Sequence, residues 1–108
     1  LFSYAGCIVI ISLISPYNSE RKKARAIRPE IFKEIYVKAS LEKCIERDVK
    51  GLYAKAISGK IKNFTGLSAP YEEPESPDLV LDTENDSIES SINQLEEYII
   101  DQFGKIKK

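Results

Sequence analysis

The sequence of 108 residues contains no histidine, no methionine and no tryptophan, and it has only two cysteines. Without histidine, the chain supplies neither a Ser-His-Asp triad nor a histidine-containing zinc site. The two cysteines, Cys7 and Cys44, are too few for a tetrahedral thiolate site, and both lie in apolar stretches. We therefore expect two buried free thiols, typical of a reducing compartment, and no metal site formed by this chain.

The sequence also lacks an excess of either charge, because 16 basic residues meet 17 acidic ones and the net charge is -1. A protein built to coat nucleic acid carries a basic excess, so we expect no nucleic-acid partner. No apolar run reaches the ~20 residues that cross a bilayer. The longest run, 5–14, is neither preceded by a basic residue nor followed by a small-residue cleavage site, so we expect no membrane partner and a cytoplasmic location.

The order of apolar patterns predicts an α/β fold with a parallel sheet. The run 7–14 is apolar on both alternating faces and rich in β-branched residues, which is typical of a strand buried on both sides. Strands are also expected at 31–38 and 79–83. Four helices are expected: one over 20–26 with Ser19 as N-cap, one that follows Ser40 as N-cap, one over 52–57, and one that follows Asp86 or Ser87. The last helix should have an apolar face formed by Ile88, Ile92, Leu95 and Ile99.

The stretch 60–77 has a different character, because it contains four of the helix- and strand-breaking residues, namely Gly66, Pro70, Pro74 and Pro77. A loop of this length in a compact domain is typically a lid or a binding loop. Ligands of parallel α/β sheets bind beyond the carboxyl ends of the strands. We therefore expect the loop to fold over that edge, and the tail 104–108 to be frayed.

Two basic groups stand out in the charge pattern. Arg21 and Arg25 lie one helical turn apart, and charge counting favours a solvated helix face for them. The second group leads into the loop and is followed by Phe64; it consists of Arg47, Lys50, Lys55, Lys60 and Lys62. An aromatic ring beside cations can hold a purine and its phosphates, and the alternative is that Phe64 anchors the loop on the core.

Five blocks of sequence, in this order and spacing, resemble the C-terminal portion of adenylylsulfate kinases. They are 13–17 (LISPY), 20–25 (ERKKAR), 46–56 (ERDVKGLYAKA), 59–67 (GKIKNFTGL) and 70–75 (PYEEPE). The resemblance implies the C-terminal part of a P-loop kinase fold, a three-layer α/β sandwich, in a homodimer. It also implies ATP- and Mg²⁺-dependent phosphorylation of the 3′-hydroxyl of adenosine 5′-phosphosulfate (APS), which yields 3′-phosphoadenosine 5′-phosphosulfate.

The resemblance also assigns roles to individual residues. Ser15 matches the family's phosphoserine position, but P-loop enzymes transfer phosphoryl groups by positioning and charge neutralisation, so we expect it to contact substrate together with Ile14. Phe64 matches the aromatic residue that stacks on the substrate adenine. The remaining assignments are Lys62 and Leu67 on the substrate side, and Arg47, Lys50 and Lys55 in the lid on the ATP side, where cations neutralise phosphate charge.

The sequence departs from the family pattern at Asn18, Lys38, Ser40 and Ile57, none of which lies in the strongest blocks. More importantly, it contains no Gly-x-x-x-x-Gly-Lys-Ser/Thr run, whose amides and lysine hold ATP phosphates while the hydroxyl holds Mg²⁺. The resemblance places that loop upstream of Leu1.

We therefore interpret 1–108 as a partial kinase domain, inactive by itself, with a large bare apolar face. The alternatives are a non-catalytic adenine-nucleotide-binding or interaction module and a P-loop kinase for other nucleotides.

Overall fold

The computed structural model describes residues 7–66 and 69–104. Its elements follow in the order α1 (Asn18–Ile27), β1 (Ile35–Lys38), α2 (Leu41–Arg47), α3 (Leu52–Ile57), β2 (Leu79–Asp82) and α4 (Ile88–Phe103). Each of the expected helices is present, as are two of the three expected strands. Among the described helices, none combines the length and the apolar composition needed to cross a bilayer. Beyond Gly104, the tail expected to be frayed lies outside the described residues.

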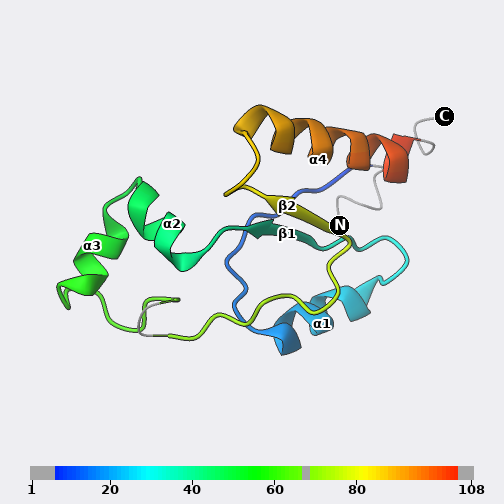
Figure 1. Cartoon of the computed structure of the whole chain (residues 1–108). Helices are drawn as coiled ribbons and strands as arrows, with labels where there is room; N and C mark the ends of the chain where they lie inside the picture. Colours follow the sequence, from blue (N-terminus) through cyan, green and yellow to red (C-terminus); the bar gives the residue numbers. More distant parts are fainter. Residues whose placement is uncertain (1–6, 67–68, 105–108) are drawn as a thin grey trace.

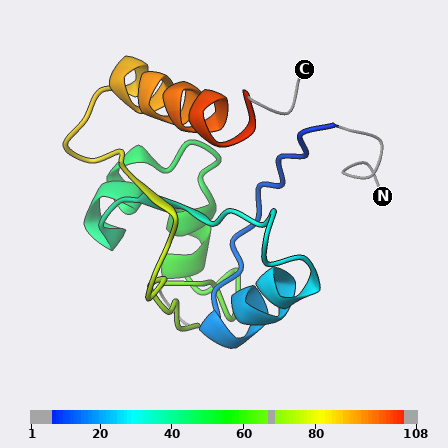
Figure 2. The same cartoon turned by 90° about the vertical axis from the view of Figure 1, so that its right-hand side faces the viewer.

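The two strands pair in parallel, with Ile35 opposite Leu79 and Lys38 opposite Asp82. Figure 1 shows α4 over one face of this pair and α1 on the other side, and the turned view in Figure 2 preserves that order. The arrangement is therefore the predicted three-layer α/β sandwich. Within the described part of the chain, Leu81 of β2 is the one buried hydrophobic residue, with 5% of its surface exposed, so the centre of the core lies between β2 and α4.

Serine side chains start two of the helices, as the sequence predicts. The hydroxyl of Ser40 accepts a hydrogen bond from the Lys43 amide at 3.2 Å. The hydroxyl of Ser87 accepts one from the Ser90 amide at 3.0 Å, which settles the choice between Asp86 and Ser87. Each bond satisfies an amide that the first helical turn leaves without a partner in the helix.

The predicted cap of α1 is wrong. This helix begins at Asn18, before Ser19, and Tyr17 occupies the N-cap position without a side-chain cap. The acceptor comes instead from a distant carboxylate, because the Asn18 amide donates to Glu72 Oε1 at 2.7 Å. A long-range contact thus replaces the local serine.

The predicted strand at 7–14 is also wrong, because these residues adopt no regular secondary structure. A strand needs a neighbour for its backbone hydrogen bonds, and the sheet in the described part of the chain contains only β1 and β2. The side chains remain in solvent; Ile10, for example, is 72% exposed. The expected bare apolar face is therefore confirmed, whereas the expected burial of Cys7 is wrong: it is exposed, and Cys44 is half-buried.

Two boundaries differ from the sequence prediction in smaller ways. β1 begins at Ile35 instead of residue 31, because the amides of Ile31 and Phe32 both donate to the Arg28 carbonyl and form a turn. The predicted apolar face of α4 is only partly covered: Ile88 and Ile92 are exposed, while Leu95 and Ile99 are half-buried. Packing on β2 covers only the side of the helix nearest that strand.

Candidate functional site

A large cleft, about 1970 Å³ in volume, brings together four of the predicted site residues. Ile14, Ser15, Lys62 and Phe64 all line it. Its other walls come from β1, α1, α4 and the apolar run 7–14. Ordinary ligand pockets measure roughly 300–1,000 Å³, so one nucleotide would fill only part of this space.

The predicted substrate turn has an unusual backbone. Ser15 has a φ of +41°, in the left-handed region that residues with a side chain seldom occupy. Its carbonyl accepts a hydrogen bond from Nη1 of Arg21, which lies six residues further along the chain. Such a conformation persists only where surrounding contacts enforce it, so the contacts of this turn are central to the site.

Arg21 is the main contact of this turn, and the sequence analysis missed it by favouring a solvated face. Its side chain is only 11% exposed. Besides Ser15, its guanidinium donates to Asn18 Oδ1 and, at 2.6 Å, to the Glu72 carbonyl. Its Nε lies 3.2 Å from Glu34 Oε2. One side chain therefore connects the turn, α1, the loop and the segment before β1.

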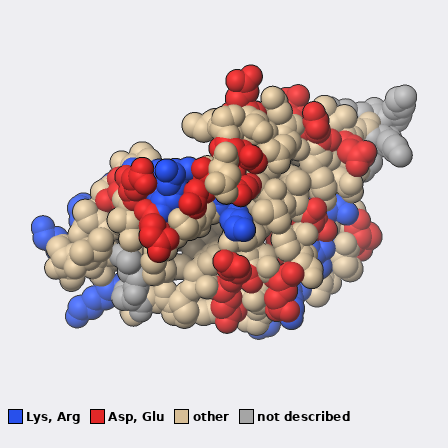
Figure 3. All heavy atoms as spheres, viewed as in Figure 1, with Lys and Arg blue, Asp and Glu red and all other residues tan. Residues whose placement is uncertain are grey.

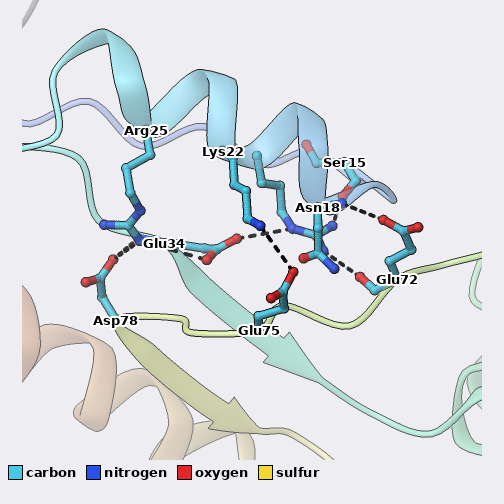
Figure 4. A network of polar contacts seen from close by, with 9 residues as sticks. Ser15, Asn18, Lys22, Arg25, Glu34, Glu72, Glu75 and Asp78 are labelled. Carbon is cyan, nitrogen blue, oxygen red and sulfur yellow. Dashed lines mark hydrogen bonds and ion pairs between the residues drawn. The ribbon is translucent and has the colours of Figure 1, made fainter.

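Glu72 completes the connection from the side of the loop. Its amide donates to the Pro16 carbonyl at 2.8 Å, and its carboxylate accepts from the Asn18 amide at 2.7 Å. Figure 4 shows Glu72 facing Asn18 at the start of α1. A carboxylate at this position both caps the helix and complements the positive end of the helix dipole.

Arg25, one turn along α1, contacts a second acidic pair. Its Nη2 lies 2.6 Å from Asp78 Oδ2 and 3.9 Å from Glu34 Oε1, as drawn in Figure 4. The Glu34 amide also donates to Asp78 Oδ2, at 2.6 Å. Burial alone would raise the pKa of Asp78, but hydrogen bonds from the Glu34 amide and the Arg25 guanidinium outweigh it and lower that pKa.

Phe64 has features of both roles considered for it. Its ring packs edge-on against Tyr53 with 4.8 Å between centroids, and the side chain is half-buried. It nevertheless lines the cleft. Just after Phe64, Thr65 and Ala69 form a parallel bridge, in which the Gly66 amide donates to the Ala69 carbonyl at 2.7 Å and the Ala69 amide to the Phe64 carbonyl at 2.9 Å. Gly66 has a φ of +91°, a conformation that favours glycine.

Leu67, also predicted for the substrate side, lies outside the described residues. Lys62 is exposed at the edge of the cleft. The three residues predicted for the ATP side do not line the cleft. Lys50 and Lys55 are exposed, and Figure 3 shows basic side chains projecting from the end of the molecule that carries α3.

Arg47 donates to the Thr83 carbonyl at 2.7 Å and to Thr83 Oγ1 at 3.3 Å, so it is bound to the end of β2. This end is the carboxyl edge of the sheet, where the ligand site of a parallel sheet is expected. No group of three or more acidic or cysteine side chains within the described residues could hold a metal ion.

Two parallel strands with helices on both faces, and a large cleft that runs along β1, agree with the P-loop kinase class. The structure of the Mycobacterium tuberculosis APS kinase in complex with AMPPNP and APS is similar to this chain, with a TM-score of 0.76 and 36% identity; the match covers 85% of this chain and 55% of that one. The fold is therefore that of the C-terminal part of a P-loop kinase.

The family model described as adenylylsulphate kinase matches residues 1–82. The adenylyl-sulfate kinase of Phocaeicola vulgatus is 54% identical over 106 residues, which are 97% of this chain and 52% of that protein. The Acaryochloris marina enzyme is 52% identical over 100 residues, which are 92% of this chain and 49% of that protein. The chain belongs to the adenylylsulfate kinase family, and it spans about half the length of the curated relatives it matches.

Proposed function

We propose that this chain forms the substrate-binding side of an enzyme that phosphorylates APS. In the reaction, the 3′-hydroxyl oxygen of APS attacks the γ-phosphorus of ATP, the bond to ADP breaks, and the hydroxyl proton is released. The observation that carries the proposal is that one cleft is lined by Ile14, Ser15, Lys62 and Phe64. The related M. tuberculosis enzyme was solved with APS and AMPPNP, which supports this substrate pair.

The proposal assigns a role to each of these four residues of the cleft. Phe64 stacks on the adenine of APS, while the cation of Lys62 neutralises charge on the 5′-phosphosulfate of APS. Ser15 and Ile14 contact the substrate through the turn. The chain contains no histidine to activate the Ser15 hydroxyl as a nucleophile, so a binding role fits this residue better than a covalent one.

The ATP side is supplied only in part by this chain. The described residues fit neither the phosphate loop of a P-loop kinase nor a Mg²⁺ ligand set, so we derive no step through the metal. Lys50 and Lys55 are exposed cations that can neutralise ATP phosphates, and Arg47 fixes the start of their segment to β2. Mg²⁺ dependence and a homodimer remain predictions from the resemblance, and a cytoplasmic location remains a prediction from the sequence pattern.

A chimera tests the proposal directly. The N-terminal half of the A. marina relative is joined to residues 1–108, and formation of ADP and 3′-phosphorylated product is measured with ATP and APS. We expect turnover by the chimera and none by the 108-residue chain. A folded chimera that binds both nucleotides without transferring phosphate would contradict the proposal.

A non-catalytic binding module is the second candidate, favoured by a cleft whose Lys62 and Phe64 suit the binding of an adenine nucleotide without phosphoryl transfer. Calorimetry of the 108-residue chain with APS separates the two. Binding by this chain, together with an inactive chimera, would favour the module. Catalysis by the chimera would favour the kinase.

A further inference from the structure

We propose that Arg21 and Glu72 form a clasp that positions the Ser15 turn against the loop limb 69–78 and thereby sets the affinity for APS. The inference rests on the proposed function, because it assigns two positioning residues to that substrate site. Neither residue belongs to the predicted substrate or ATP contacts. Both act on the turn from outside it, one from α1 and one from the loop.

Glu72 bonds to both sides of the turn at once. Its amide donates to the Pro16 carbonyl at 2.8 Å, and its carboxylate accepts the Asn18 amide at 2.7 Å. These two bonds lie on either side of Tyr17, so the loop cannot separate from the turn without losing both. The second bond is also the N-cap of α1, which has no cap from Tyr17 itself. The start of this helix therefore depends on the loop.

Arg21 joins the same parts through charge-assisted hydrogen bonds. Its guanidinium donates to the Ser15 and Glu72 carbonyls, which lie on opposite sides of the contact between turn and loop. The Nε edge of the same guanidinium faces the carboxylate of Glu34, just before β1. A planar fork with several donors can hold these acceptors simultaneously, whereas the single ammonium of lysine cannot reproduce that geometry.

The clasp affects the shape of the cleft through cleft-lining residues that Arg21 contacts directly. Ser15 and Tyr71 both line the cleft, and the Arg21 guanidinium lies 5.8 Å from the centre of the Tyr71 ring. Without the clasp, the left-handed Ser15 backbone can relax and the wall formed by the limb can move away. The cations proposed for ATP belong to the other end of the molecule, where Arg47 binds Thr83. The effect should therefore be specific to APS.

Steady-state kinetics of the chimera test this specificity. We expect Glu72→Ala and Arg21→Lys to raise the KM for APS about tenfold, the equivalent of about 1.4 kcal/mol and within the cost of losing a helix cap. The KM for ATP should change less than about twofold. Glu72→Gln, which retains an oxygen acceptor for the Asn18 amide, should restore part of the affinity.

Lys22→Ala is the matched control, because Lys22 joins α1 to the same limb through an exposed ion pair with Glu75. It should leave both KM values unchanged. If Glu72→Ala alters neither KM, or raises both equally, the clasp does not position the substrate turn. A purely structural role would lower the fraction of active enzyme, and hence kcat, without a selective change in the KM for APS.

Hydrogen exchange on the 108-residue chain gives a second readout that needs no catalysis. The backbone amides of Asn18 and of residue 72 should be less protected from exchange in Glu72→Ala and equally protected in Lys22→Ala. Unchanged protection in Glu72→Ala would overturn the clasp even if the chimera is active. Conversely, faster exchange together with an unmutated chimera that binds but does not phosphorylate APS would overturn the proposed function and leave the contact intact.

Discussion

The two segments that meet at the Ser15 turn are held in opposite ways. On the C-terminal side, α1 is bound to the limb 69–78 by hydrogen bonds and ion pairs through Arg21, Arg25 and Glu72. On the N-terminal side, the run 7–14 is strongly apolar, adopts no regular secondary structure and lies largely in solvent. The more hydrophobic segment is the less constrained one.

The difference shows what each kind of contact requires. A hydrogen bond or ion pair needs one partner atom at the right place, and the loop supplies such atoms to α1 from within this chain. Apolar burial needs an area of surface, and a strand needs a neighbouring backbone as well. In the described part of the chain, the two strands pair only with each other, so the run 7–14 has neither a covering apolar surface nor a neighbouring strand.

The largest expected effect tests the apolar side of this comparison. Leu81→Ala removes the buried centre of the core and should lower the free energy of unfolding of the 108-residue chain by about 2–4 kcal/mol. Ile10→Ala should change it by less than about 0.5 kcal/mol, because Ile10 is already 72% exposed. Urea unfolding of the two variants measures both values.

The same pair of substitutions in the chimera sharpens the result. There we expect Ile10→Ala to cost about 2 kcal/mol or more, because the added half should bury the run. A cost that is equally small in both proteins would show that the run 7–14 stays exposed in the longer protein, and our explanation of its bare face would fail.

Phe64 combines the two kinds of contact, since its apolar ring lines the cleft while its carbonyl accepts a hydrogen bond from the Ala69 amide. Phe64→Ala should weaken binding of APS to the chimera by about 1–3 kcal/mol, the usual contribution of an aromatic ring stacked on a base. Calorimetry measures this loss. Tyr53→Phe, which keeps the ring contact and removes only a hydroxyl, should leave APS binding unchanged. If APS binding is unchanged in Phe64→Ala, then Phe64 only anchors the loop and does not stack on the adenine.

The polar side of the comparison should depend on pH through Asp78. Its pKa is lowered from the ordinary 3.8, so its ionised form stabilises the fold above that value, and this stabilisation is lost as the pH falls through the lower folded pKa. At about pH 7, Asp78→Asn should cost about 1.5 kcal/mol, the lower end of what a hydrogen bond to a charged group contributes, because asparagine keeps an oxygen acceptor. The cost should shrink at about pH 3. An equal cost at both pH values in urea unfolding would contradict the role of this charge.

Local features of the fold could be predicted from the sequence, and long-range ones only in part. Ser40 and Ser87 cap their helices through amides three residues away, a distance at which sequence alone is informative. The strand predicted at 7–14 was wrong because a hydrophobic pattern shows which side chains can be buried. It does not show whether a neighbouring strand is present to pair with them. Pattern alone also placed the apolar face of α4 on Ile88 and Ile92, which remain exposed.

The candidate site shows the same division. Ser15, Lys62 and Phe64 lie within the motif blocks, and the structure brings them to one cleft. Arg21 and Glu72 were missed as a pair because they lie 51 residues apart, and only the fold brings the Arg21 guanidinium to the main-chain carbonyl of Glu72. Both also lie within motif blocks, 20–25 and 70–75. Their residue types alone gave only a weak signal, because a basic helix followed by an acidic loop is equally typical of solvated surfaces.

The smallest expected effect concerns the ion pair between Lys22 and Glu75, which joins α1 and the limb beside the clasp. Its atoms are 3.4 Å apart, but the two side chains are 72% and 63% exposed, so water and salt screen the attraction. Lys22→Ala should lower the free energy of unfolding by at most about 0.5 kcal/mol, less so at high salt. A loss as large as that of Asp78→Asn would mean that charge alone, irrespective of burial, holds the loop to α1. A negligible loss would assign that work to the buried guanidinium of Arg21 and the helix cap of Glu72.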